Sequence, residues 1–141
     1  MSSWGNDTTQ AAIALPEPSA TEISEPHWQA CKEQKLLVQQ CSNCQSYTFP
    51  PEKNCPQCFE NTLDWQQSSG KGKIYSFTIV YRPQTPAFNT PYVAAIIELD
   101  EGWHMLSNII DCDIDKLAIN QAVAVCFEKR GKSVLPMFRT V

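Results

Sequence analysis

Two cysteine pairs with a fixed spacing constrain this chain more than any other feature of its sequence. Two residues separate Cys41 from Cys44 and Cys55 from Cys58, and ten residues lie between the pairs. A two-residue spacing lets one tight turn direct both sulfur atoms to a common point, and two such turns supply four thiolates in a tetrahedral arrangement. The spacing therefore predicts a metal site formed by these four cysteines.

The metal predicted for this site is a structural zinc ion. All four ligands are cysteines, so no coordination position is left for a catalytic water. Metal binding also supplies folding free energy to a module that is too small to bury a core of its own. Iron in a rubredoxin-like site is the less favoured metal. Two disulfides or four buried thiols are the interpretation without a metal.

The length and composition suit a small protein with a packed core. The 141 residues are 43% hydrophobic and 18% charged, with a net charge of −4. No apolar run approaches the roughly 18 residues that a transmembrane helix needs. The N-terminus lacks the basic start and apolar stretch of a secretory signal, so we expect a cytoplasmic protein. In that reducing compartment, the seven cysteines favour metal binding over disulfides.

Three segments follow one another along the chain. Residues 1–21 are rich in Ser, Thr, Ala and Pro and predict a disordered tail. Residues 22–62 contain a short helix and the cysteine pairs, and residues 63–141 contain most of the strand pattern.

A helix is expected ahead of the cysteines. Pro26 suits its first turn, and it would extend to about Gln34. Trp28 and Cys31 fall on one face of this helix, which is too short to be stable alone. We therefore expect Trp28 and Cys31 to dock on the rest of the chain or to bind a partner.

The C-terminal segment is typical of a small β-barrel. Alternating apolar residues predict five strands, with a short helical turn between the third and the fourth. This order is that of an OB-fold, although an open β-sandwich has a similar strand content. The strands are expected to start near Ile74, Val93, Met105, Val123 and Leu135.

The first of these strands and the turn after the second give more specific expectations. Tyr75, Phe77 and Ile79 are expected on one face of their strand, with Ile74 on the other. Gly102 ends the turn after Leu99 and is expected to adopt a positive φ.

Few residues offer catalytic chemistry. Cys31, Cys112 and Cys126 could act as nucleophiles, but a catalytic thiol needs a base and an orienting group. The only histidines are His27, on the expected surface helix, and His104, on an expected strand. No pattern pairs a cysteine with a histidine, so we expect that the chain is not an enzyme by itself.

The connection between the first two barrel strands is a candidate ligand loop. It runs from Arg82 to Pro91 and contains three prolines, which limit its freedom. In OB-folds this loop borders the ligand face, so Arg82 and Phe88 are candidate ligand-binding residues, with Phe88 expected to be exposed. An ordinary stiff loop explains the pattern equally well.

Three blocks of sequence carry a family resemblance. Together they resemble the family of small zinc-ribbon plus OB-fold proteins associated with acyl-CoA metabolism, over about residues 26–138. The blocks are Cys41-Ser42-Asn43-Cys44 with Phe49-Pro50-Pro51 and Cys55-Pro56-Gln57-Cys58; Trp65 with Gly70-Lys71-Gly72-Lys73-Ile74-Tyr75-Ser76-Phe77-Thr78; and Pro91-Tyr92-Val93-Ala94 with Leu99-Asp100-Glu101-Gly102.

The resemblance implies a mainly β fold and an accessory role. Its members have an N-terminal helix, a rubredoxin-like zinc ribbon and a five-stranded OB-fold barrel. They act as non-catalytic subunits or fused domains beside thiolase-like enzymes, enoyl-CoA hydratases or an aldolase, and are thought to help bind or channel the CoA ester. By position, Phe49 and Pro50 in the ribbon loop become candidate ligand-binding residues.

The sequence departs from the family pattern at two positions. Gln45 stands where members often have a Gly after the second cysteine, in a turn that prefers a positive φ. Glu52 stands where members often have an Arg that could meet a CoA phosphate, and Lys53 is the candidate substitute.

The expected function is that of a non-catalytic accessory subunit. It would bind a thiolase-type acyl-CoA enzyme, or a hydratase or aldolase, and help to hold or channel the acyl-CoA. The alternative is a module that binds single-stranded nucleic acid, in which Tyr75, Phe77 and Tyr81 would stack on bases. The acidic net charge argues against that alternative.

Overall fold

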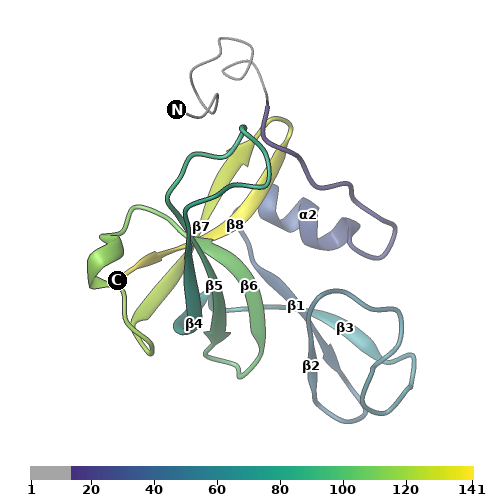
Figure 1. The fold of residues 1–141 in the computed structure, drawn as a ribbon. Coiled ribbons are helices and arrows are strands. Elements are labelled where there is room, and N and C mark those ends of the chain that lie inside the picture. The colour runs from purple at the N-terminus through teal and green to yellow at the C-terminus, as the bar shows by residue number, and fades with distance from the viewer. Residues whose placement is uncertain (1–13) are drawn as a thin grey trace.

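The computed structural model describes residues 14–141, which form a short helix, a three-stranded ribbon and a closed β-barrel (Figure 1). Residues 1–13 of the expected disordered tail lie outside the described residues. Within the described part, no helix has the length and apolar character required to cross a membrane. The mainly β architecture of helix, ribbon and five-stranded barrel confirms the expected fold class.

Helix α2 (Glu25–Lys32) carries its proline at the start, as expected. It ends two residues earlier than predicted, because Gln34 adopts a left-handed conformation with φ 60°. His27, Ala30 and Cys31 are buried on its inner face. The expectation that His27 lies on the surface is therefore wrong. His27 precedes Cys31 by four residues, so both side chains lie on the same inner face of the helix.

The ribbon strands are β1 (Leu37–Cys41), β2 (Tyr47–Thr48) and β3 (Leu63–Gln67), paired antiparallel in the order β2-β1-β3. Residues 63–67 lie at the start of the segment that was expected to form the barrel. Their backbone pairs with β1, from Leu37 opposite Gln67 to Cys41 opposite Leu63, so β3 belongs to the ribbon sheet.

The barrel contains five strands, which close in the order β4-β5-β6-β8-β7. Closure distinguishes this fold from an open sandwich, and it confirms the OB-fold arrangement. The 3-10 helix η1 (Ile114–Lys116) lies between the third and fourth strands, as expected. The strands are β4 (Lys71–Val80), β5 (Tyr92–Leu99), β6 (His104–Ile109), β7 (Ala122–Arg130) and β8 (Ser133–Thr140).

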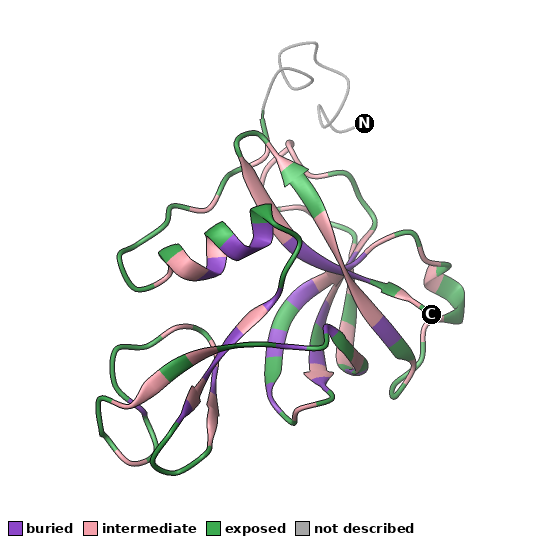
Figure 2. Cartoon of the chain, turned by 180° about the vertical axis from the view of Figure 1, so that it is seen from behind, coloured by how far each residue is buried: buried purple, intermediate pink, exposed green. Residues whose placement is uncertain are grey.

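Most of the core lies inside the barrel, where the buried residues of β5 and β6 alternate with half-buried or exposed ones (Figure 2). Strand β4 departs from the expected alternation. Its pairing with β5 shifts between Ile74 and Ser76, which is a β-bulge that adds one residue to the strand. Ile74 is therefore fully buried, Phe77 packs against the same core, and Tyr75 points outward.

The ribbon and the barrel are joined by a hydrogen-bonded turn. The carboxylate of Glu101 accepts bonds from the Ser68 hydroxyl (2.8 Å), the Ser69 N–H (2.8 Å) and the Trp103 indole N–H (3.0 Å). Burial opposes ionisation, but these donors hold the pKa of Glu101 below its usual range. The next residue, Gly102, has the expected positive φ of 100°. Glu101 thus fixes the position of the ribbon relative to the β5–β6 turn.

Candidate metal centre and adjoining clefts

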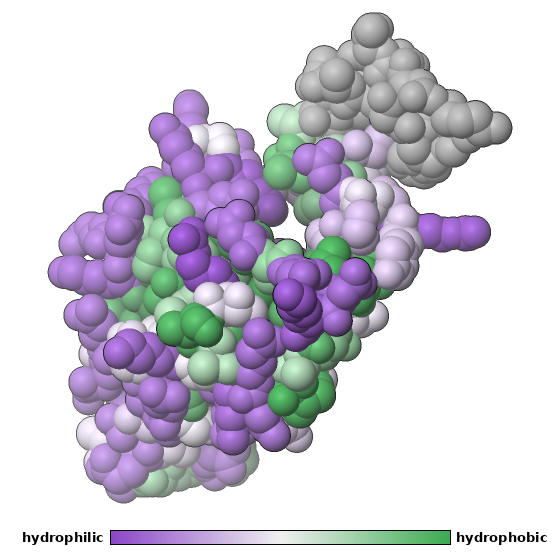
Figure 3. All heavy atoms as spheres, turned by 90° about the vertical axis from the view of Figure 1, so that its left-hand side faces the viewer, coloured by the Kyte–Doolittle hydropathy of each residue, from purple (hydrophilic) through white to green (hydrophobic). Residues whose placement is uncertain are grey.

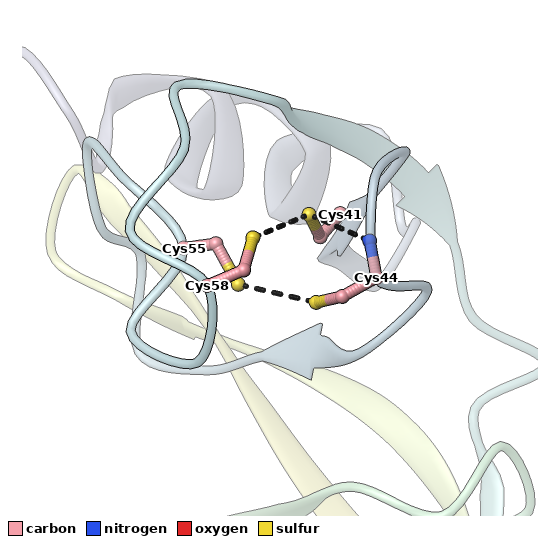
Figure 4. A group of neighbouring side chains, drawn as sticks. All are labelled: Cys41, Cys44, Cys55 and Cys58. Carbon is pink, nitrogen blue, oxygen red and sulfur yellow. Dashed lines mark hydrogen bonds between the residues drawn. The ribbon is translucent and has the colours of Figure 1, made fainter.

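The four predicted cysteines converge at one end of the ribbon, from two loops that face each other (Figure 4). Their sulfur atoms all lie within 4.8 Å of one another. The Sγ atoms of Cys41 and Cys58 are 3.6 Å apart, as are those of Cys44 and Cys55. Four sulfurs around one ion at about 2.3 Å would be separated by about 3.8 Å. The cluster therefore has the dimensions of a tetrahedral structural metal site.

Hydrogen-bond donors surround these sulfurs. The Thr62 hydroxyl lies 3.0 Å from Cys41 Sγ and lowers the pKa of that thiol. The Ser46 hydroxyl lies 3.0 Å from Cys44 Sγ and 3.5 Å from Cys55 Sγ, and it is the largest cause of a Cys55 pKa of about 6. Such donors favour the thiolate, which is the form that binds a metal.

Both turns that follow the cysteine pairs have a left-handed residue that is not glycine. Gln45 follows Cys44 with φ 68°, which confirms the positive φ expected there. Phe59 follows Cys58 with φ 66°, which was not expected from the sequence. Its side chain is 78% exposed, so an aromatic ring stands in solvent on a turn that favours glycine. Phe59 directly follows the second cysteine of its pair, as Gln45 does, and this equivalent position could have revealed the positive φ at Phe59.

The ribbon loop with the candidate ligand residues packs against the helix and the barrel. The ring of Phe49 lies 5.5 Å from the His27 ring and 5.2 Å from the Trp103 ring. Phe49 is therefore a structural bridge between the ribbon, helix α2 and the β5–β6 turn.

A cleft of about 490 Å³ lies where these three parts meet, and we call it the helix–barrel cleft. Its walls come from the segment 19–24, helix α2, the ribbon loop, β6 and β8, so no single part of the chain forms it. Phe49, Pro50 and Trp28, which the sequence analysis singled out, all line it. The apolar side chains of Met105, Leu106, Leu135 and Met137 form much of the rest of its lining.

Cys31 does not line this cleft. Its side chain is completely buried, which removes it from the expected partner-binding face. Burial raises the pKa of its thiol to about 12 and lowers the pKa of His27 to about 4. The two side chains are 3.8 Å apart and both are neutral at pH 7, so they do not form the thiolate–imidazolium pair of a catalytic cysteine.

Phe88 lies in a second cavity, of about 340 Å³, which we call the loop pocket. The expectation that Phe88 is exposed is wrong, because its ring stacks on Tyr92 at 5.7 Å and lies under the guanidinium of Arg130. The structure thus places Phe49 and Pro50 in one cavity and Phe88 in another. Lys53 and Arg82 are exposed and line neither of the two.

The remaining reactive residues are dispersed. His104 is exposed on β6, with Nε2 3.6 Å from the Glu98 carboxylate and its ring against Tyr75. Burial raises the pKa of Cys112, which makes its thiolate less available.

Two family models match consecutive parts of the chain. Residues 28–64 match the ChsH2 rubredoxin-like zinc ribbon domain, and residues 65–128 match the ChsH2 C-terminal OB-fold domain. Together they cover most of the residues that the structure describes.

Curated relatives carry two kinds of name. A probable enoyl-CoA hydratase alpha subunit of Thermomonospora curvata is 33% identical over 94% of this chain, which spans only 42% of that relative. A DUF35 domain-containing scaffold protein of Methanocaldococcus jannaschii is 35% identical over 72% of this chain and 74% of its own length.

Two solved structures also resemble this chain. A chain of a structure titled Ltp2-ChsH2(DUF35) aldolase superposes with a TM-score of 0.80 and 30% identity, over 88% of this chain and 98% of that chain. A DUF35 protein of Sulfolobus solfataricus has the same fold at 14% identity, with a TM-score of 0.62 over 86% of this chain and 87% of its own. The chain therefore belongs to the DUF35 family, in which a rubredoxin-like zinc ribbon precedes an OB-fold domain.

Proposed function

We propose that this protein is a non-catalytic accessory subunit that binds a thiolase-type acyl-CoA enzyme and helps to hold the acyl-CoA. The observation that carries the proposal is the helix–barrel cleft, which is apolar and exists only because ribbon, helix and barrel are joined. An acyl chain is an apolar ligand, and ligand sites commonly lie at such junctions.

The names of the relatives support a partner enzyme that acts on CoA esters. Three relatives are named scaffold proteins, two are named hydratase alpha subunits, and the structural neighbour is titled an aldolase. A scaffold protein acts together with a partner, and a subunit belongs to a complex, so both kinds of name imply a partner protein. The thiolase type is the specific part of our proposal and rests on the family resemblance.

The chemistry of the described residues supports a non-catalytic role. The four-cysteine cluster has no open ligand position, because four sulfurs complete a tetrahedral site. We propose that zinc is the metal held there and that it stabilises the ribbon. Outside the cluster, the closest cysteine and histidine, Cys31 and His27, are buried and neutral.

Exposed apolar side chains near the cleft provide the proposed partner contact. Leu106 lines the cleft and is 72% exposed, and Trp28 is half-buried on its helical wall. Large apolar and aromatic side chains at the centre of an interface contribute most of its binding energy. The partner is therefore expected to cover Leu106 and Trp28, and thereby to close the cleft over the acyl group.

Affinity purification of the tagged full-length chain from its native host tests this proposal. A thiolase-type enzyme in stoichiometric amount is the expected result, and Leu106→Asp should release it while the control Gln29→Ala should not. A hydratase or aldolase instead would keep the accessory role and refute the thiolase. If Leu106→Asp retains as much of the partner enzyme as the wild type does, the proposed contact surface is refuted.

Binding of nucleic acid is the competing hypothesis, because two aromatic side chains are exposed: Tyr75 on β4 and Tyr81 directly after β4. Phe77, the third aromatic residue considered for stacking, packs against the core instead. Binding of a single-stranded oligonucleotide at low salt, lost in Tyr75→Ala but not in Phe59→Ala, would favour this role over the accessory one.

A further inference from the structure

The described chain begins beside the tip of the β7–β8 hairpin (Figure 1). There the Glu17 carboxylate accepts hydrogen bonds from the Lys132 N–H at 3.0 Å and from the Ser133 hydroxyl at 3.3 Å. The Arg130 guanidinium donates to the Pro16 carbonyl at 3.4 Å. Three residues of one hairpin thus hold two consecutive residues that lie more than a hundred positions earlier in the sequence.

The shape of the hairpin turn matches the carboxylate. Gly131 has φ +60°, and a Cβ atom added there would collide with the carboxylate of Glu17. The carboxylate therefore occupies space that only glycine leaves free. The open space at Gly131 and the two hydrogen bonds together place the Glu17 carboxylate against this turn.

The loop pocket adjoins this seat. Leu15 forms part of its wall, together with Phe88, Val93, Ile109 and Met137. Arg130 connects the two features, because it donates to Pro16 and its guanidinium also lies 5.9 Å from the centre of the Phe88 ring.

The position of the pocket is that of an OB-fold ligand site. The loop between the first two barrel strands and the hairpin between the last two border the ligand face in this fold. Here these are residues 81–91 and 131–132, and the loop pocket is lined by Phe88 and Asn89 from the first and by Arg130 from the base of the second. On the η1 side of the barrel, apolar areas lie between hydrophilic ones (Figure 3), and Ile114 of η1 also lines the loop pocket.

We propose that the loop pocket and the hairpin turn form a peptide-binding site, which this chain fills with its own residues 15–17. The site recognises an apolar side chain at the pocket, a carbonyl group at Arg130 and a carboxylate at the turn around Gly131. Leu15, Pro16 and Glu17 supply these three groups in order. A segment of another protein with the same apolar–x–acidic pattern would compete for the site by displacing them.

The contact is suited to exchange. Its polar bonds lie at the surface, where each contributes little because water competes for the same groups. Displacement of residues 15–17 needs no change in the barrel strands, and it uncovers the side of the pocket that Leu15 now forms. This inference does not depend on the acyl-CoA role, since the loop pocket shares only Asn108 and Met137 with the helix–barrel cleft, and Leu15, Phe88 and Arg130 line the loop pocket alone.

The test uses the full-length, metal-loaded chain and Cys112, whose side chain lines the loop pocket, as a reporter. Alkylation by N-ethylmaleimide is located by mass spectrometry in the wild type and in the double variant Leu15→Ala, Glu17→Gln. Cys112 is expected to react at least about fivefold faster in the variant, because the loss of Leu15 opens one wall of its pocket and the hydrogen bonds that hold the segment in place are weakened together. Cys126, which does not line the pocket, should react at an unchanged rate, and the control Glu22→Gln should behave as the wild type.

The peptide acetyl-Ala-Leu-Pro-Glu-amide then restores the missing groups in trans. It should slow the alkylation of Cys112 in the double variant, and the same peptide with Gln in place of Glu should not. An equal Cys112 rate in wild type and variant overturns the proposal. So does protection by inorganic phosphate as strong as that by the peptide, since the turn would then bind any anion without the pocket.

Discussion

Gln39 and Glu52 exchange two hydrogen bonds across the ribbon. The Gln39 amide donates to the Glu52 carbonyl at 2.9 Å, and the Glu52 N–H donates to the Gln39 side-chain oxygen at 2.8 Å. Gln39 is only 5% exposed, so its amide acts as an internal clamp. Because Gln39 lies on β1 between the helix and the cysteines, this clamp orients the loop that carries Phe49 and Pro50 into the cleft.

Replacing Gln39 with Leu should lower the free energy of unfolding by about 1–3 kcal/mol, because two backbone groups of Glu52 lose their partners. Urea unfolding of the metal-loaded protein measures the effect. Gln66 is exposed on β3, and Gln66→Leu is the matched control with an expected change below about 0.5 kcal/mol. Equal stability of the two variants would show that water replaces the clamp.

Replacing Glu52 with Arg should leave stability unchanged, since its backbone forms the bonds to Gln39 and its side chain is exposed. The same change restores the charge that the family pattern places there. If acyl-CoA binds near this loop, affinity should rise about 1.5-fold to fivefold, as is typical of one added exposed charge. Isothermal titration at two salt concentrations measures it, and an affinity that does not change with the charge would place the CoA phosphates elsewhere.

Replacing Cys41 with Ser should remove the metal and unfold the ribbon. Wild-type protein should contain one zinc ion per chain by elemental analysis and lose ribbon structure on chelation, since metal binding is folding free energy for such a module. Cys126→Ser is the control, because Cys126 lies outside the cluster. Full zinc content and an unchanged melting temperature in Cys41→Ser would contradict the proposed site.

Replacing Phe59 with Gly should stabilise the metal-loaded protein by about 0.5–1 kcal/mol, because its φ of 66° suits glycine and its exposed ring loses little packing. Thermal unfolding measures the change. Phe59→Ala keeps the unfavourable backbone conformation and removes the ring, so it should show no gain. If Phe59→Gly and Phe59→Ala raise the stability equally, the exposed ring and not the backbone conformation of Phe59 lowers the stability of the wild type.

Lowering the pH should destabilise the protein through His27. Burial lowers its pKa to about 4 in the folded state, against 6.5 for a free histidine. The unfolded chain therefore binds the extra proton first, and stability is lost progressively as the pH falls from about 6.5 towards 4, by at most about 1.4 kcal/mol per pH unit. Its contribution is fully present above pH 6.5.

The unfolding free energy of wild type and His27→Phe, compared between pH 7.5 and 5, isolates this effect because both proteins share the metal site. The variant should show a shallower pH dependence. Parallel curves would mean that another group titrates. His104→Phe is the matched control, since His104 is exposed.

Local chemistry determined much of what the sequence revealed. The four-cysteine cluster followed from spacing, because a two-residue gap fixes both sulfurs of a pair within one turn. The positive φ at Gln45 and Gly102 followed from turn chemistry. The five barrel strands followed from apolar alternation, since each strand buries one face.

Tertiary structure alone decided the features that depend on which parts of the chain meet. The bulge after Ile74 reverses the faces of β4, and no local pattern reveals it because it exists only relative to β5. His27 is buried and Cys31 is withdrawn from the surface because the helix packs with that face inward. Phe49 and Phe88 line different cavities, which adjoin at Asn108 of β6 and Met137 of β8. Spacing along the chain specified which four cysteines come together, whereas both cavities are products of long-range packing.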